Sequence, residues 1–310
     1  MSRLTSSLID SHQHVFWHGR DDTGLVADMD EHGINQAWLL TWEIPPEEDH
    51  PFYHNILNPE HSRPDGTHGG IRLSDLLRAR DRFPGRFVLG YCPHPCHGDA
   101  AALLEAAHHI HGVQVCGEWK FRVLFDDPRC LNLFHMAGQL GMPVVLHLDV
   151  PYRPNPDTGT PDYDPMWYGG TVDNLERALA ACPETLFVGH APGFWREISG
   201  DADEDSEAYP QGPITPGGRL QRLLATYANL YADLSANSAL RALRRDPNHA
   251  RELLETFSDR FLFGRDQYGG DLMQYLTTIN LSDSAWSAIA HGNARRLLKP
   301  GAVAHSDAPR

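Results

Sequence analysis

The sequence predicts an α/β protein whose parallel strands close into a (β/α)8 barrel. Short apolar runs alternate with helix-like segments along the chain, and eight such runs are present. A length of 310 residues is sufficient for one barrel of this kind. An open doubly wound sheet more often has a glycine-rich phosphate turn after an early strand, and the sequence contains none. The sustained alternation therefore favours a closed barrel.

The expected strands and helices follow one another in order. The strand candidates are the apolar runs Leu8–Phe16, Gln36–Trp42, Phe87–Tyr91, Gly112–Phe121, Pro143–Val150, Thr185–His190, Leu230–Ser235 and Arg260–Asp266. The helix candidates are Leu73–Arg82, Ala100–Ile110, Cys130–Leu140, Val172–Ala181, Leu220–Tyr227, Arg251–Phe257 and Trp286–Leu298. Gly141 and Pro143 mark one boundary between these elements, because they end one helix and open the next strand.

Three long connections follow strands and are rich in proline, glycine and acidic residues. They are Glu43–Gly70, Pro151–Gly170 and Ala191–Gly218. In a barrel, connections after strands lie on the C-terminal face, where function resides. Connections of this length are typical of lids and binding loops. We expect one domain over residues 1–299, followed by a disordered tail over residues 300–310.

Composition excludes several classes of partner. A net charge of −15 argues against nucleic acid, whose phosphates select basic surfaces. No segment approaches the ~18 apolar residues of a membrane span, and the first eight residues lack the apolar core of a signal peptide. Five cysteines without paired CxxC motifs are typical of reduced thiols. We therefore expect a cytoplasmic protein with a small-molecule substrate, and homo-oligomers remain open.

His12 and His14 end the first apolar run and are separated by one residue. On a β-strand, side chains two apart point to the same face. Two adjacent imidazoles fill a core poorly and hold a metal ion well. The alternative is a polar loop in a chain that contains 19 histidines.

Three other strands also end in an ionisable residue, which favours the metal site over the loop. His147, His190 and Asp266 end the fifth, sixth and eighth runs. Imidazole and carboxylate ligands suit Zn²⁺, and Mn²⁺ is also accepted. An open coordination position would activate water. Asp266 is then a ligand, a general base or both, and His190 is a ligand, a base or a donor to the developing oxyanion.

These motifs together resemble the amidohydrolase superfamily over about Leu8 to Lys299. The resemblance rests on His12-Gln13-His14, on the strand-terminal His147 and His190, on Phe263-Gly264-Arg265-Asp266, and on the run Ile289–Leu298. It is greatest to the amidohydrolase-related branch that includes aminocarboxymuconate semialdehyde decarboxylase.

The resemblance implies a distorted (β/α)8 barrel with one or two divalent metals at its mouth. His12, His14, His147 and Asp266 match the family's metal ligands, and His190 matches a residue that ligates a second metal or acts in catalysis. The chain departs from the family where Arg265 replaces Ser or Thr, and where Ala191-Pro192 replaces the Gly-Glu of the decarboxylases. These departures weaken any transfer of decarboxylase activity.

The fourth strand leaves three alternatives. Glu118 and Lys120 are two residues apart, so both can point into the barrel. Glu118 can bridge two metals, as a glutamate does in the TatD nuclease family. Lys120 can form the bridge instead if it is carboxylated. The third alternative is a buried ion pair between the two side chains. We favour Glu118 as a ligand, because buried carboxylates are rare unless they are paired or metal-bound.

Other polar and aromatic residues are expected to be structural. Arg122 is predicted at the surface, although it could grip a substrate carboxylate. His54, His61 and His68 are expected to be solvated. Asp233 and Ser235 have two alternatives, contact with the substrate or structural hydrogen bonds. Some aromatic residues near strand ends are candidates for a pocket wall: Trp17, Trp42, Trp119, Trp167, Phe194 and Trp195.

The sequence thus favours a metal-dependent hydrolase that opens a lactone, amide or related carbonyl bond. The alternative is a lyase that decarboxylates a small carboxylated substrate at the same metal site. A metal-holding binding protein is the third hypothesis, although open strand-end sites usually serve chemistry. The substrate itself depends on the three long loops.

Overall fold

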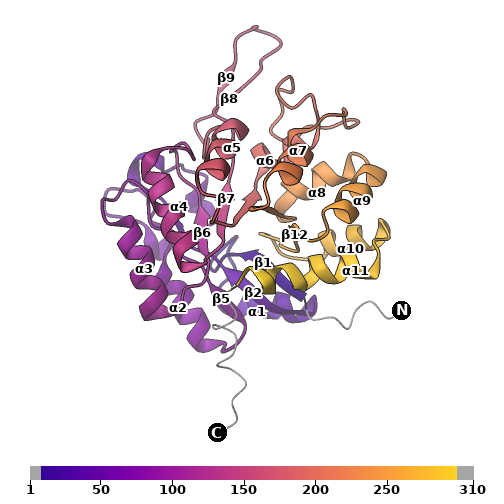
Figure 1. The fold of residues 1–310 in the computed structure, drawn as a ribbon. Coiled ribbons are helices and arrows are strands. Elements are labelled where there is room, and N and C mark those ends of the chain that lie inside the picture. Colours follow the sequence, from indigo (N-terminus) through magenta and orange to yellow (C-terminus); the bar gives the residue numbers. More distant parts are fainter. Residues whose placement is uncertain (1–7, 299–310) are drawn as a thin grey trace.

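Eight parallel strands, each of which overlaps one predicted strand, surround the centre of the computed structural model, which describes residues 8–298 (Figure 1). They are β1 (Leu8–Gln13), β2 (Ile34–Leu39), β5 (Phe87–Leu89), β6 (Cys116–Trp119), β7 (Val144–His147), β10 (Phe187–His190), β11 (Leu230–Asp233) and β12 (Phe261–Leu262). The predicted α/β barrel is therefore confirmed.

The barrel consists of two sheets that meet at two seams. One sheet has the order β1-β2-β5 and the other β12-β11-β10-β7-β6. A single parallel bridge between Gly90 and Val115 links β5 to β6. At the second seam, Ser11 N donates to Phe263 O at 2.8 Å, which joins β1 to the chain just after β12. Regular strand pairing is interrupted at both seams, so the barrel is distorted.

The barrel interior is filled by apolar side chains, one on or directly beside each of the eight strands. These residues are Ile9, Trp38, Val88, Val115, Val145, Val188, Tyr231 and Leu262. Leu297 of α12 (Asn293–Leu297) packs in the same cluster and so belongs to this layer. Because side chains alternate along a strand, the residue two positions after an interior residue also points inward, nearer the C-terminal mouth. His147 follows Val145 in this way, and His190 follows Val188.

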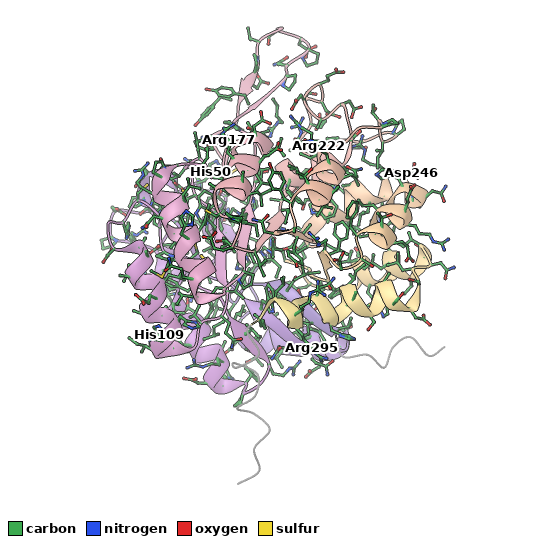
Figure 2. All side chains as sticks on the ribbon, viewed as in Figure 1. His50, His109, Arg177, Arg222, Asp246 and Arg295 are labelled. Carbon is green, nitrogen blue, oxygen red and sulfur yellow. The ribbon has the colours of Figure 1, made fainter. Side chains whose placement is uncertain are left out.

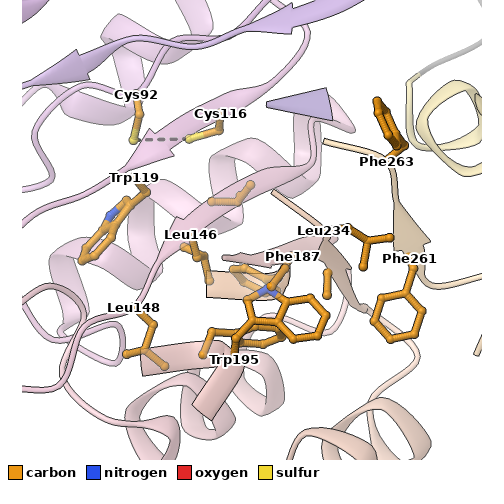
Figure 3. Close-up of a cluster of buried hydrophobic side chains, with 14 of the residues drawn as sticks. Cys92, Cys116, Trp119, Leu146, Leu148, Phe187, Trp195, Leu234, Phe261 and Phe263 are labelled. Carbon is orange, nitrogen blue, oxygen red and sulfur yellow. Dashed lines mark hydrogen bonds between the residues drawn. The ribbon is translucent and has the colours of Figure 1, made fainter. Parts of the chain in front are cut away.

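Helices pack around the outside of the barrel (Figure 1). They are α1 (Asp22–Glu31), α2 (Leu73–Arg82), α3 (Ala100–His111), α4 (Pro128–Leu140), α5 (Val172–Ala181), α7 (Arg219–Thr226), α8 (Ala236–Arg244), α9 (Pro247–Thr256), α10 (Asp271–Thr278) and α11 (Asp283–Ser287), with a π-helical turn, η6 (Ala288–Gly292), before α12. Buried Trp119, Phe187, Trp195 and Phe261 belong to the main hydrophobic core (Figure 3). The side chain of Arg222 on α7, labelled in Figure 2, is 47% exposed.

The number of helices differs from the prediction. We expected one helix after each late strand, whereas α8 and α9 follow β11 and α10 and α11 follow β12. The sequence analysis also missed α1. This helix buries Leu25, Val26 and Met29, but Asp28 is buried beside them, so its apolar stripe is interrupted.

The three long connections contain short elements and are not irregular throughout. The first holds the antiparallel strand pair β3 (Trp42–Glu43) and β4 (Gly70–Ile71) and three turns, η2 (Pro46–Glu48), η3 (Tyr53–Asn55) and η4 (Pro59–His61). The second forms the hairpin β8 (Tyr152–Arg153) and β9 (Asp162–Tyr163), which projects from the barrel (Figure 1). The third begins with α6 (Pro192–Trp195) and η5 (Arg196–Ile198).

The structure corrects the predicted exposure of the histidines in the first long connection. We expected His54, His61 and His68 to be solvated, but His61 and His68 are buried and only His54 is partly exposed. His61 pairs with Asp75 on α2, and His68 Nε2 lies 2.8 Å from Asn58 O. The two buried rings satisfy polar groups inside the connection and so hold its shape.

The structure also bears on the sequence expectations about membrane spans, cysteines and the C-terminal tail. Within residues 8–298, no helix is long and apolar enough to cross a membrane. All five cysteines are free thiols, and four of them are buried. The predicted tail at 300–310 lies outside the described residues.

Truncating the interior layer tests the architecture. We expect Leu297→Ala to lower the free energy of unfolding by about 2–5 kcal/mol, because it leaves a cavity in the barrel interior. Urea denaturation followed by circular dichroism measures this change. Ile110→Ala is the control: its side chain is 73% exposed, so the change should stay within about 0.5 kcal/mol. Equal effects of the two substitutions would contradict the role assigned to Leu297.

Candidate metal centre

The six predicted site residues converge at the C-terminal mouth of the barrel. His12 lies on β1, and His14 follows it directly. Glu118, His147 and His190 lie on β6, β7 and β10, and Asp266 follows β12. Five of the side chains are no more than 10% exposed, and the Asp266 side chain is 14% exposed. The strand-end positions that were read from the sequence therefore place these groups together.

Their ligand atoms lie close to one another. His14 Nε2 is 3.4 Å from Glu118 Oε2 and 3.5 Å from Asp266 Oδ1. His12 Nε2 is 3.9 Å from both Glu118 Oε1 and Asp266 Oδ1. His190 Nε2 is 3.7 Å from Asp266 Oδ2 and 4.0 Å from Glu118 Oε1. Three overlapping groups with metal-binding spacing result: His12/His190/Asp266, His12/His14/Glu118 and Glu118/His147/His190.

The arrangement fits a divalent metal. His12 Nε2 and Asp266 Oδ1 are buried and have no hydrogen-bond partner among the described residues. Unpartnered buried polar atoms are costly unless something else satisfies them. Ligands about 2.0–2.2 Å from a common ion at tetrahedral angles lie roughly 3.3–3.6 Å apart, which is close to the distances here. Imidazole with carboxylate is also the donor set that such ions prefer.

Asp233 orients two of the imidazoles. Its buried carboxylate lies 2.8 Å from His12 Nδ1 and 3.0 Å from His190 Nδ1. Ser235 Oγ donates to the same carboxylate at 2.6 Å. A proton on each Nδ1 leaves the Nε2 lone pairs facing the centre. Asp233 and Ser235 thus form structural hydrogen bonds, one of the two alternatives left by the sequence.

His14 and His147 are held in other ways. His14 Nδ1 lies 2.9 Å from the Leu40 carbonyl oxygen, which leaves Nε2 toward the centre. His147 has a carboxylate at each nitrogen, Glu118 Oε1 at 2.6 Å from Nδ1 and Asp149 Oδ2 at 2.9 Å from Nε2. Asp149 therefore anchors one side of the His147 ring, and Nδ1 faces Glu118.

The electrostatics of the cluster favour a bound cation. Burial lowers the pKa of His12, but Asp233, Asp266 and Glu118 raise it to about 9. Burial opposes ionisation of Glu118, yet Lys120 and His147 hold the pKa of that carboxyl well below its usual range. A charged imidazole among anionic carboxylates shows that positive charge is stabilised at the His12 position. A metal ion meets the same demand when it replaces the proton.

Arg265 fixes the position of Asp266. Its Nε lies 2.7 Å from Asp10 Oδ2 on β1, and its Nη1 lies 2.7 Å from Asp28 Oδ2 on α1. Asp266 itself has φ of 49°, and its backbone N donates to His12 O at 2.9 Å. The arginine that departs from the family pattern therefore ties the last strand to the first, and it carries Asp266 toward His12.

The three alternatives for strand four are now distinguishable by geometry. Glu118 faces the imidazoles, as a bridging ligand must. Lys120 Nζ lies over the Trp42 ring at 4.1 Å and has no carboxylate within 4.0 Å in the described structure. The Glu118–Lys120 ion pair is therefore not formed. Arg122 is partly exposed and donates to the carbonyl oxygens of Glu47 and Glu48.

The aromatic residues divide between the site and the core. The Trp17 ring lies 5.4 Å from the His14 ring, and Trp17 Nε1 donates to Asp266 O at 2.9 Å. Trp42 contacts Lys120. The remaining buried aromatics pack in the hydrophobic core (Trp119, Phe194 and Trp195). Trp167 is partly exposed in the second long connection, where its Nε1 donates to Tyr163 Oη.

No model of a known protein family matches the sequence, and no curated protein sequence matches it. Solved structures do share its fold. A 5-carboxyvanillate decarboxylase from Sphingomonas paucimobilis is 17% identical with a TM-score of 0.60, and the match covers 94% of this chain and 98% of that one.

Two other solved structures match in the same way. A dihydroxybenzoic acid decarboxylase from Polaromonas, with bound manganese and the inhibitor 2-nitroresorcinol, is 17% identical with a TM-score of 0.58, over 94% of this chain and 97% of that one. A Pseudomonas putida protein assigned as a 2-pyrone-4,6-dicarboxylic acid hydrolase is 16% identical with a TM-score of 0.56, over the same shares. Identity this low shows the fold, so the TIM barrel that the motif resemblance implied is confirmed.

Glu118→Gln tests the bridging role. Because Glu118 belongs to two of the ligand groups, we expect bound metal to fall from two equivalents to one, as measured by inductively coupled plasma mass spectrometry. Glutamine keeps the shape of the side chain and removes its charge. Unchanged metal content together with unchanged activity would refute the bridge.

Asp233→Asn tests the orientation of the histidines. The amide cannot replace a carboxylate that accepts from both His12 and His190, so we expect metal affinity to fall about 10–100-fold. Competition with a chelating dye measures the affinity. Asp173→Asn, at an exposed position on α5, removes the same charge and should leave the affinity unchanged. Equal affinity in both variants would contradict the orienting role.

Proposed function

We propose that this protein is a metal-dependent hydrolase that uses water to open a lactone, amide or related carbonyl bond of a small molecule. The observation that carries the proposal is Asp266 Oδ1, a buried carboxylate oxygen without a hydrogen-bond partner in the described structure. It lies 3.5 Å from His14 Nε2 and 3.9 Å from His12 Nε2. A free carboxylate oxygen beside the ligand cluster is positioned to accept a proton from water.

His12, His14, Glu118, His147, His190 and Asp266 are the residues that would hold one or two cations. A divalent cation, when bound, polarises a carbonyl and acidifies water. Asp266 accepts the proton as the water oxygen bonds to the carbonyl carbon, and the carbonyl π electrons move to oxygen. When the carbon–oxygen or carbon–nitrogen bond breaks, Asp266 returns the proton to the leaving group.

His190 supports this chemistry as a ligand and not as a hydrogen-bond donor. Burial lowers the pKa of His190 more than Asp233 raises it, so the ring is neutral near pH 7. Its Nδ1 lies 2.7 Å from Ser235 Oγ and 3.0 Å from Asp233 Oδ1, and either oxygen can accept the single proton of the ring. Nε2 then carries a lone pair, which can bind a cation but cannot donate to an oxyanion.

We further propose Zn²⁺ as the metal, with Mn²⁺ as the alternative. The imidazole-rich donor set supports zinc, whereas one of the similar solved structures holds manganese. The five free thiols support a reducing compartment, and we propose the cytoplasm.

Asp266→Asn tests the base. We expect kcat/KM for hydrolysis to fall about 10²–10⁴-fold, because asparagine cannot accept the proton of water. Metal content is measured on the same sample, since Asp266 is also a candidate ligand. Asp173→Asn serves again as the charge-matched control and should retain full activity.

The reaction class is tested on the metal-loaded protein with lactones, amides and aromatic carboxylates. Acid release in a pH-stat is the expected result for lactones, and amine release is the expected result for amides, because their carboxylate and ammonium products release no net proton near pH 7. Carbon dioxide release without acid release would replace the hydrolase with a decarboxylase, the reaction named for two of the similar solved structures. No release of acid, amine or carbon dioxide across the panel, with metal confirmed, would indicate a binding protein.

A further inference from the structure

Lysine is almost absent from this chain, and one of its two lysines lies at the site. The sequence has 26 lysines and arginines, of which only Lys120 and Lys299 are lysines. Arginines make the charge pairs elsewhere; Arg222, for example, donates to both carboxylate oxygens of Glu176. Arginine suits such two-pronged pairing, whereas lysine presents a compact charge with three donors. The position of Lys120 therefore requires its own explanation.

Aromatic rings hold the Lys120 ammonium group. Nζ lies 4.1 Å from the centre of the Trp42 ring and 5.3 Å from the centre of the Tyr168 ring. Both rings are 2% exposed, and Tyr53 fixes them by packing edge-on against Trp42 and by a hydroxyl contact with Tyr168. Ring faces attract a cation but accept its N–H hydrogens poorly. The ammonium is thus positioned while its donors remain available.

No carboxylate contacts this ammonium directly in the part of the chain that the structure describes. Among residues 8–298, no carboxylate lies within 4.0 Å of Nζ, and no hydrogen bond from Nζ is present. The nearest carboxylate in sequence, Glu118, is occupied by His14 and His147. Lys120 is partly exposed, so its donors are open to solvent or to a ligand.

The ammonium also borders the ligand cluster. Tyr168, which contacts Lys120, has its ring 5.3 Å from the His147 ring. Lys120 helps to hold the pKa of Glu118 low, although burial of Glu118 opposes that effect. An anion bound at Nζ would therefore lie at the edge of the metal site, within the span of a small molecule.

We propose that Lys120, positioned by Trp42 and Tyr168, binds a carboxylate of the substrate, so that the substrate is a small carboxylic acid anion. This inference rests on the proposed function, because it names the substrate class of that site. The carboxylate that binds Lys120 is separate from the bond that is hydrolysed. The positive charge of Lys120 beside the cluster suits a chain whose net charge of −15 would otherwise repel an anion.

Binding can be tested without turnover. In Lys299→Arg protein, Lys120 is the only lysine, and reductive methylation with ¹³C-formaldehyde labels it while keeping its charge. The label is read by NMR on the metal-loaded protein and assigned by its absence in Lys120→Arg. Benzoate and benzamide are the probes, since they match in shape and differ in charge. We expect benzoate to shift the Lys120 signal saturably and benzamide to leave it unchanged.

Calorimetry on variants tests whether Lys120 or the metal is the group that binds the carboxylate. We expect Lys120→Met to weaken benzoate binding roughly 10-fold or more, because a charge-assisted hydrogen bond is lost, and Lys120→Arg to retain most of the affinity. Equal benzoate affinity in wild-type and Lys120→Met protein would overturn the proposal. A carbamate signal on Lys120 after addition of ¹³C-bicarbonate would also overturn it, since the lysine would then be a carboxylated metal ligand.

Kinetics distinguish this inference from the proposed function. The substrates are γ-butyrolactone bearing a γ-carboxylate and the corresponding γ-carboxamide. Lys120→Met should raise KM for the carboxylate about 10-fold or more and change kcat less, and it should raise KM for the carboxamide by a clearly smaller factor. Hydrolysis of both lactones with the same KM in the variant as in wild type would refute the carboxylate site alone. Benzoate binding at Lys120 without any hydrolysis would refute the proposed function alone.

Discussion

The buried ion pair between Asp10 and Arg265 is the interaction on which the site depends. Asp10 belongs to the strand that carries His12, and Arg265 directly precedes Asp266, so the pair joins the first and last strands of the barrel. The same carboxylate accepts from the backbone N of His12 at 3.3 Å and from that of Arg265 at 2.9 Å. Loss of one member of a buried pair typically costs about 3–5 kcal/mol. Here it would also separate Asp266 from the histidines.

Charge balance explains the other features of the mouth. Glu118, Asp233 and Asp266 bring three carboxylates into a mostly buried volume with four imidazoles. Such a cluster is costly unless hydrogen bonds and positive charge satisfy it. Asp233 is satisfied by His12 and His190, whereas Glu118 and Asp266 leave room for a cation. Lys120 adds charge at the rim, where an anionic substrate would need it. The metal and substrate hypotheses thus share one electrostatic cause.

Much of the fold and most of the candidate site could be predicted from local pattern. Four strand ends were recognisable because the apolar run stops at an ionisable residue, as in Val145-Leu146-His147. The helices α8 and α10 were missed because one helix was assigned to each strand, and α1 because Asp28 interrupts its apolar face. Asp28 is buried for a reason that lies 237 positions away in the numbering, at Arg265. A local pattern contains no signal for such a partner.

The sequence by itself determined the strand–helix alternation, the barrel and the positions of His12, His14, His147, His190 and Asp266, because side-chain alternation and strand direction are local properties. Only the tertiary structure decided how these groups are used. In the folded barrel Asp233 lies between two imidazoles, Glu118 faces the candidate metal ligands, and the Lys120 ammonium lies over the Trp42 ring. Those relations join residues distant in sequence, and their energies depend on burial and distance, which exist only once the barrel has closed.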